Sequence, residues 1–155
     1  MADTELLNLI ETDINTCRQL LETLDLEFTA LGERHIEQLQ QLLQSKQPLL
    51  ESLARNANRR TAILREHGHE ASAEGFMAFA ASAPDTARLA EQHQQLAALM
   101  ETCQAANIRN GRLIRTNQVG VGSALNILRG NDGPALYNRS GSTTSSGSNR
   151  TYTRA

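Results

Sequence analysis

Apolar side chains recur at alternating steps of three and four residues along the first 31 residues of this chain. A heptad pattern of this kind keeps one face of a helix apolar along its whole length, so it predicts an α-helix packed against another helix. We expect Asp3 or Thr4 to cap the start of this helix and Gly32 to end it. The predicted seam is Leu7, Ile10, Ile14, Cys17, Leu21, Leu24, Phe28 and Leu31.

A second heptad helix is predicted from about residue 33 to residue 67, with Gly68 as its end. Its apolar stripe is weaker than the first, because Lys46 and Arg60 fall on it. Pro48 lies inside this range and removes a helix hydrogen bond, so we expect a kink or a break near it. The acidic side chains of the first helix are expected on its exposed faces.

A third long helix is predicted to begin near Pro84 and Asp85, after a connection with a short helix at residues 73–83. Ser82 is a candidate cap for the long helix. A separate, short helix is then expected from residue 116 or 117, with Val121, Leu125 and Leu128 along one side. The glycines at 120 and 122 each cost about 1 kcal/mol relative to alanine, so this helix is marginal alone.

The composition agrees with an all-α fold, because aromatic residues make up only 3% of the chain and strands favour aromatic and β-branched residues. We therefore predict an elongated antiparallel bundle of about three long helices, a short C-terminal amphipathic helix and a disordered tail. The helical domain is expected to cover residues 1–137. The tail, residues 138–155, contains 11 Ser, Thr or Gly residues in 18, which cannot offset the entropy of ordering.

Charge is distributed unevenly along the chain. Residues 1–54 hold ten acids and three bases, whereas residues 102–155 hold seven arginines and one acid. The basic part could face nucleic acid, anionic lipid or an acidic protein, or pair with the acidic first helix. Without Lys/Arg clusters or interleaved aromatic residues, we expect no nucleic-acid binding.

Three further features of the sequence bear on the cellular compartment of the protein. No apolar run approaches the roughly 20 residues that span a bilayer, so no membrane insertion is expected. The start of the chain shows no basic leader followed by an apolar segment. Cys17 and Cys103 lie on apolar stripes and are predicted to be buried, reduced thiols. These features predict a cytoplasmic protein.

No residue pattern supports catalysis. His67 and His69 are two residues apart, whereas a helical metal pair needs a spacing of three or four, so the histidines, including His35 and His93, are expected to be solvated. No paired carboxylates are expected in a dry setting, and no phosphate-binding loop is found. We therefore predict neither an enzyme, a cofactor nor a metal site.

Binding is the better hypothesis, and it concerns the C-terminal part. The segment from Val121 to Leu128 either completes the bundle or acts as a groove-binding or groove-forming element. Tyr137 either folds back as a lid or anchors a partner, since tyrosine is enriched at binding hot spots.

Four blocks, in this order, resemble the FlgN family of flagellar export chaperones. They are Leu6–Ile10, the block Leu39–Leu50 running to Arg59–Leu64, Asn107–Ile114, and Ala124–Gly130 followed by Leu136–Gly141. The resemblance covers about residues 4–142.

The resemblance implies a cytosolic type III export chaperone for the hook–filament junction proteins FlgK and FlgL. It assigns client binding to Val121, Leu125 and Leu128, with Leu113 and Ile114 as extensions. It also implies that Tyr137 contacts the export gate protein FlhA. Two alternatives remain from the residues themselves. One is a homodimeric coiled-coil scaffold built on the heptads, and the same heptads also allow a weak homodimer. The other is a nucleic-acid adaptor.

Overall fold

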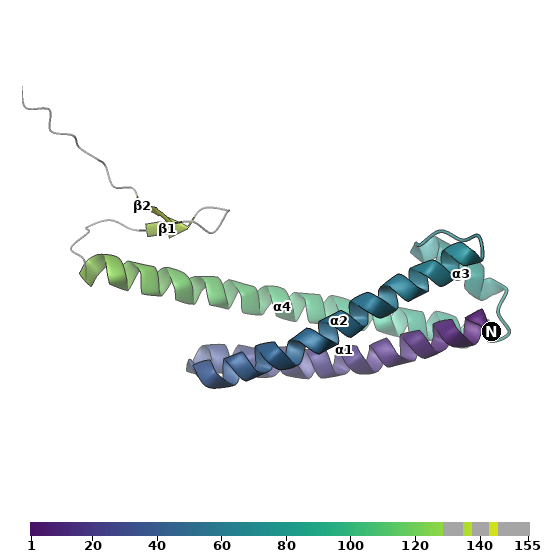
Figure 1. Cartoon of the computed structure of the whole chain (residues 1–155), viewed down its shortest axis with the longest axis horizontal. Helices are drawn as coiled ribbons and strands as arrows, with labels where there is room; N and C mark the ends of the chain where they lie inside the picture. Colours follow the sequence, from purple (N-terminus) through teal and green to yellow (C-terminus); the bar gives the residue numbers. More distant parts are fainter. Residues whose placement is uncertain (129–134, 138–142, 146–155) are drawn as a thin grey trace, which may run out of the picture. The chain divides into compact units, whose positions relative to one another are not determined.

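The computed structural model describes residues 1–128, 135–137 and 143–145, with side chains described up to residue 115 (Figure 1). Within these ranges the chain forms four helices, three long and one short, which confirms the all-α fold class. Two three-residue strands follow them. The elements are α1 (Ala2–Glu33), α2 (Ile36–Glu66), α3 (Ala73–Ala81), α4 (Thr86–Leu128), β1 (Ala135–Tyr137) and β2 (Thr143–Ser145).

The chain divides into two compact units, Met1–Asn110 and Gly111–Ala155, and the boundary falls inside α4. The first unit contains α1, α2, α3 and the first part of α4. The second contains the rest of α4 and the antiparallel pair of β1 with β2, in which Tyr137 lies opposite Thr143. The predicted tail, residues 138–155, lies outside the described residues except for β2, and its disorder stays a prediction.

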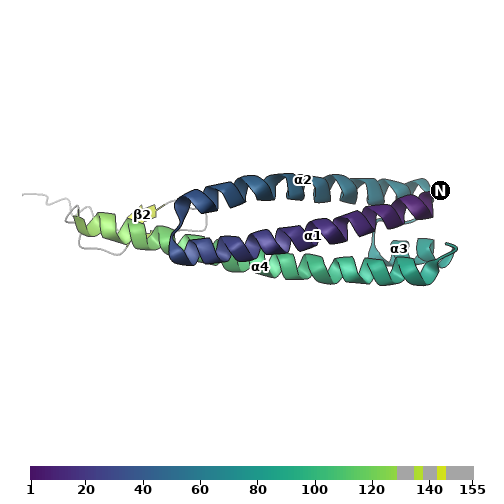
Figure 2. The same cartoon turned by 90° about the horizontal axis from the view of Figure 1, so that it is seen from below.

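In the first unit, α1 lies between α2 and α4 (Figure 2). The α1–α2 contacts run in opposite directions along the two helices, as the bonds from Asn56 to Asp13 and from Lys46 to Glu27 show. The α1–α4 contacts run in the same direction, since Arg88 binds Glu11 and the Cys103 thiol donates to the Cys17 carbonyl. The three long helices therefore run up, down and up.

Most of the predicted seam of α1 is buried, and the buried stripe is wider than the predicted one. Leu7 and Leu21 are half-buried and pack against the core, whereas Phe28 is 42% exposed with the Arg109 guanidinium over its ring, so the assignment of Phe28 was wrong. Because α1 packs between two helices, it buries a wider stripe than a two-stranded seam needs. The buried side chains are Leu6, Ile10, Asp13, Ile14, Cys17, Leu20, Leu24, Glu27, Ala30 and Leu31.

The helix ends differ from the predictions in detail. α1 begins at Ala2 without a side-chain cap, and it passes through Gly32 to end where Arg34 adopts a left-handed φ of 58°. α2 continues through Pro48 without a break. Gly68, which takes a φ of 76°, follows the end of α2 as predicted.

The short helix α3 is anchored by its aromatic side chains. Ser72 accepts a hydrogen bond from the Gly75 amide at its start, while Phe76 and Phe79 are buried. Ser82 lies at the C-terminal end of α3 and does not cap α4. The Asp85 carboxylate instead accepts from the Arg88 amide, 3.4 Å away, at the start of α4.

The predicted separate C-terminal helix is absent, because α4 runs without interruption from Thr86 to Leu128. Asn107 and Asn110, at which the apolar pattern turns polar in the sequence, lie within the helix. Gly120 and Gly122 also lie inside it. The segment that carries Val121, Leu125 and Leu128 is therefore a continuation of a long helix, so its start needs no nucleation of its own.

Candidate functional site

The predicted binding residues lie in the second unit. Leu113 and Ile114 are half-buried residues of α4. Val121, Leu125 and Leu128 lie further along the same helix, and their side chains are outside the described residues. Tyr137 is the last residue of β1. The backbone thus joins five of the six predicted residues through one helix and puts Tyr137 in a separate strand.

A buried ion pair crosses the α1–α2 contact near the middle of the first unit. Asp13 is fully buried and is held by the Arg60 guanidinium and by the Asn56 amide, whose Nδ2 lies 2.7 Å from Asp13 Oδ1. Burial lowers the pKa of Arg60. Both carboxylate oxygens therefore have partners, as a buried charge requires.

A second buried ion pair lies two heptads away on the same two helices. The Glu27 carboxylate accepts from Lys46 Nζ at 3.0 Å and from Asn110 Nδ2 at 3.2 Å. Asn110 is itself fully buried and also donates to the Leu24 carbonyl at 2.8 Å. This polar layer ties α1 to both α2 and α4. We call these two groups of residues the Asp13 layer and the Glu27 layer.

The sequence interpretation missed both layers, because it expected every acid of α1 on an exposed face. Asp13 and Glu27 occupy seam positions two heptads apart in α1, and Arg60 and Lys46 have the same spacing on the α2 stripe. In an antiparallel helix pair, equal spacing of acids and bases lets every acid meet a base. The equal spacing of the acids in α1 and the bases in α2 was the sequence signal from which the two layers could have been predicted. The layers are fully paired, so they support structure and not acid–base chemistry.

Three histidines surround α3 and are not simply solvated. The rings of His67 and His69 meet Phe79 edge-on, and the half-buried His93 stacks on Phe76 at 3.9 Å between ring centroids. Burial and the charge of Arg60 lower the pKa of His93. Among the described residues, no group of three or more His, Cys, Asp or Glu side chains is arranged to hold a metal ion.

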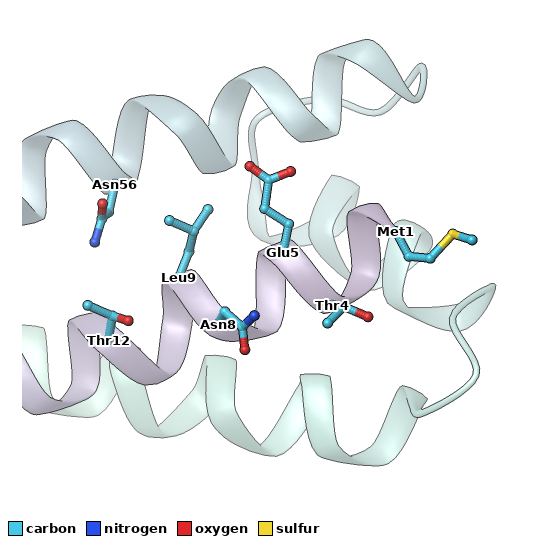
Figure 3. Close-up of a pocket in the computed structure, with 7 residues that line it drawn as sticks. All are labelled: Met1, Thr4, Glu5, Asn8, Leu9, Thr12 and Asn56. Atoms are coloured by element: carbon cyan, nitrogen blue, oxygen red, sulfur yellow. The ribbon is translucent and has the colours of Figure 1, made fainter.

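An open hollow of about 450 Å³ lies at the start of α1, and Figure 3 shows the residues that line it. Its charged group, Glu5, is bound by Arg59 with a distance of 2.6 Å, and Asn56 is already bonded to Asp13. These polar groups are engaged within the chain, so the hollow offers little to a ligand. It is lined by Met1, Thr4, Glu5, Asn8, Leu9, Thr12 and Asn56.

A second hollow, of about 280 Å³, is mainly apolar and lies entirely within the first unit. Both cysteines line it, and they are buried as predicted. Burial and the neighbouring Cys103 thiol raise the pKa of Cys17 to about 11, so this thiol is not a nucleophile near neutral pH. The lining is Cys17, Leu20, Leu24, Lys46, Leu50, Leu53, Met100, Cys103, Gln104 and Asn107.

A comparison with known protein families identifies the family of this chain. The FlgN protein family matches residues 1–145, nearly the whole sequence. This chain belongs to the FlgN family. The matched range includes all four helices and β1, so it covers every residue of the predicted binding site.

A solved structure extends this likeness of the FlgN-family chain. A Pseudomonas aeruginosa protein, described as a flagella synthesis protein FlgN, is 46% identical to this chain and superposes with a TM-score of 0.68. The similarity covers 79% of this chain and 94% of that one. A comparison with curated proteins found no match. The present chain is thus a flagellar protein of the FlgN type.

Charge pairing within this FlgN-family chain accounts for part of the basic C-terminal third. Arg109 forms an ion pair with Asp25 of α1 at 3.1 Å. This pair agrees with the alternative that the basic part of the chain pairs with the acidic first helix. In the described residues, no helix is long and apolar enough to cross a membrane.

We predict that lowering the pH destabilises the FlgN-family chain through His93. The folded state holds His93 with a lowered pKa, so below the ordinary histidine pKa of about 6.5 the unfolded state binds the proton more readily. The contribution of His93 to stability is therefore complete above this pH and declines as the pH falls. Melting temperatures of the wild type and His93→Gln, measured from pH 8 to pH 5, should show a smaller decline in the variant. An equal decline in His93→Gln and the wild type would contradict the role of His93.

Proposed function

We propose that this chain is a cytoplasmic chaperone of flagellar type III export, a binding protein without enzymatic activity or cofactor. Its clients would be the hook–filament junction proteins FlgK and FlgL, taken up through their C-terminal helical segments and delivered to the export gate protein FlhA. The observation that carries the proposal is the family match over residues 1–145, which extends through the end of α4 to Tyr137.

The helix geometry agrees with this role. Val121, Leu125 and Leu128 are spaced four and three residues apart, which puts their positions on one face of α4, and Ile114 lies one heptad before Val121. Leu113 is adjacent. Junction proteins held before assembly expose apolar helices, and a chaperone that covers such a helix needs an apolar stripe of its own.

Delivery requires an interaction that is also released. A modest net affinity meets this need, because the entropy that the two proteins and their interface side chains lose on binding offsets part of the contact free energy. Tyr137 lies beyond the apolar stripe in sequence, so it can serve a second partner while α4 holds the client. We assign Tyr137 to the contact with FlhA.

The test is binding of purified FlgK and FlgL to the full chain. We expect Leu125→Asp combined with Leu128→Asp to weaken binding roughly hundredfold or more, because two apolar anchors would each become a charge in a desolvated contact. Isothermal titration calorimetry measures the loss. Absence of any complex between the wild type and either junction protein at about ten micromolar, a weak affinity for such an interface, would refute the proposal.

The matched control places the same charges on the opposite face of α4. Ser123→Asp combined with Asn126→Asp adds two aspartates to the same turns, and we expect it to retain the clients. Tyr137→Ala should also retain the clients while losing binding to FlhA. Equal losses in both aspartate pairs would mean that charge, and not the apolar stripe, governs the contact.

The homodimeric coiled-coil scaffold has weaker support. Its heptad seam in α1 is buried within the chain against α2 and α4, so that surface does not serve a second copy.

A further inference from the structure

Cys17 of α1 and Cys103 of α4 lie side by side in the core of the first unit, although 86 positions separate them in the sequence. The Cys103 thiol donates a hydrogen bond to the Cys17 carbonyl, with 3.3 Å between Sγ and O. The two thiols also form a direct hydrogen bond that changes the pKa of each. Both are free, so the core holds an unlinked pair of sulfur atoms at the contact between two helices.

The α1–α4 contact holds this pair in register. Leu24 and Asn110 each follow the corresponding cysteine by one heptad, and the Asn110 side chain donates to the Leu24 carbonyl at 2.8 Å. This bond repeats the contact of Cys103 with the Cys17 carbonyl, with the same separation of 86 residues. Because Asn110 is also bound to Glu27, sliding of α4 along α1 would break buried polar contacts. The two thiols therefore stay opposite each other in the folded chain.

A small oxidant can reach the pair from the apolar hollow that both cysteines line. The hollow has a volume of about 280 Å³ and opens to solvent beside Leu50 and Met100, which are 41% and 40% exposed. A water molecule takes up about 30 Å³ in the liquid, so the hollow has room for a molecule of the size of hydrogen peroxide. Because Cys17 is fully buried and Cys103 is 6% exposed, larger reagents are excluded from the thiols.

The surroundings give the two thiols different reactivities. Burial raises the pKa of both, and burial together with the neighbouring Cys103 raises the pKa of Cys17 to about 11. The hydrogen bond between the thiols acts in the opposite sense on Cys103 and lowers its pKa, because the Cys17 thiol donates to the Cys103 sulfur. A thiolate forms more readily on Cys103 than on Cys17, so Cys103 is the thiol that attacks a reagent in the hollow.

We propose that Cys17 and Cys103 are a site of reversible oxidation, at which hydrogen peroxide converts the two thiols into a disulfide that links α1 to α4. In the first step the Cys103 thiolate attacks one peroxide oxygen and the O–O bond breaks. This step leaves a sulfenic acid on Cys103, and the departing hydroxide takes up the thiol proton to form water.

The second step joins the two sulfur atoms. The Cys17 sulfur attacks the Cys103 sulfur, the S–O bond breaks, and the departing hydroxide takes the Cys17 proton to form a second water. Cys17 does not attack a reagent from solution, and it reacts here because it is held against the sulfenic acid. The two thiols lose two electrons and peroxide gains them. Reduction by a dithiol restores both cysteines.

The disulfide would add a covalent link to a contact that is otherwise held by packing and hydrogen bonds. It joins residues that are far apart in the sequence, so it removes conformational entropy from the unfolded chain. We expect the melting temperature of the oxidised chain to be roughly 5 °C or more above that of the reduced chain. This inference concerns the first unit alone and does not depend on the proposed chaperone function.

The test exposes the folded full chain to millimolar hydrogen peroxide and then alkylates the remaining thiols under denaturing conditions. We expect neither cysteine to be alkylated, and a peptide map without reductant should contain a species that joins the Cys17 and Cys103 peptides. Dithiothreitol should separate the two peptides. The crosslinked fraction should not depend on protein concentration, because the bond forms within one chain. The map also distinguishes the crosslink from oxidation of the exposed methionines.

Single substitutions test the roles of the two thiols. Cys17→Ser should stop the reaction at the sulfenic acid of Cys103, which dimedone traps as a stable adduct. Cys103→Ser should leave Cys17 unreacted and give no adduct. Circular dichroism establishes that each variant is folded, and alanine is used at a position where serine prevents folding.

Several results would overturn the inference. Two free thiols in the treated wild type, or sulfinic acids at both positions without a crosslink, would show that the sulfur atoms do not meet. A crosslinked fraction that grows with protein concentration would assign the bond to two chains. An oxidised chain that melts at or below the temperature of the reduced chain would show that the link does not fit the native contact. A dimedone adduct in Cys103→Ser but not in Cys17→Ser would overturn the assignment of Cys103 as the attacking thiol.

Discussion

Replacing Asp13 by alanine is expected to lower the free energy of unfolding by about 3–5 kcal/mol. The substitution leaves the Arg60 guanidinium, which is largely buried, and the Asn56 amide without their shared carboxylate. An unpaired buried charge costs far more than the pair itself contributes. Thermal denaturation followed by circular dichroism should show a melting temperature roughly 10 °C lower.

The chain offers a matched control on the same helix. Asp25 also pairs with an arginine, Arg109, but both side chains are exposed, so Asp25→Ala should cost about 1 kcal/mol or less. Asp13→Leu combined with Arg60→Met removes both buried charges and should recover most of the lost stability. If Asp13→Ala and Asp25→Ala were equally mild, the Asp13 layer would not be a buried pair in solution.

Replacing Phe76 by alanine is the second substitution with a large expected effect, about 3–5 kcal/mol. Phe76 is buried, anchors α3 to the rest of the first unit and stacks on His93. Its removal leaves a cavity that a nine-residue helix has few other contacts to close. Chemical denaturation with urea measures the change in free energy.

The neighbouring Met77 is the control for this prediction. Met77→Ala removes a side chain that is 48% exposed on the same helix and should change stability by less than about 1 kcal/mol. A similar small effect in Phe76→Ala would indicate that α3 contributes little to the core.

The heptads predicted the first two long helices and most of the buried apolar residues of α1, but not its buried acids or the uninterrupted length of α4. Periodicity counts apolar residues, and it therefore passed over Asp13 and Glu27, which lie on the buried seam because each has a cation opposite. The predicted break before Val121 failed for a related reason. Asn110 interrupts the apolar pattern in the sequence, yet it is buried in the Glu27 layer inside α4.

The candidate binding site was located through a family resemblance alone, and its residues stay a prediction. The order of sequence blocks pointed to the FlgN family, and with it to Val121, Leu125, Leu128 and Tyr137. The apolar hollow that both cysteines line could not be found in this way, because its lining residues Leu50 and Met100 have the same pattern as core residues. Whether such a residue is covered depends on how the helices pack, which no single stripe specifies.

The two polar layers also constrain the insertions and deletions that α1 and α2 can accept. Leu20 and Leu53 occupy the heptad position between the layers, so a shift of α2 by one heptad along α1 would put each charge opposite a leucine. Deleting seven residues between the layers from one helix alone would leave one of the two acids without its base. Insertions and deletions should therefore survive in descendants of this sequence when they occur in α1 and α2 together, as paired heptads.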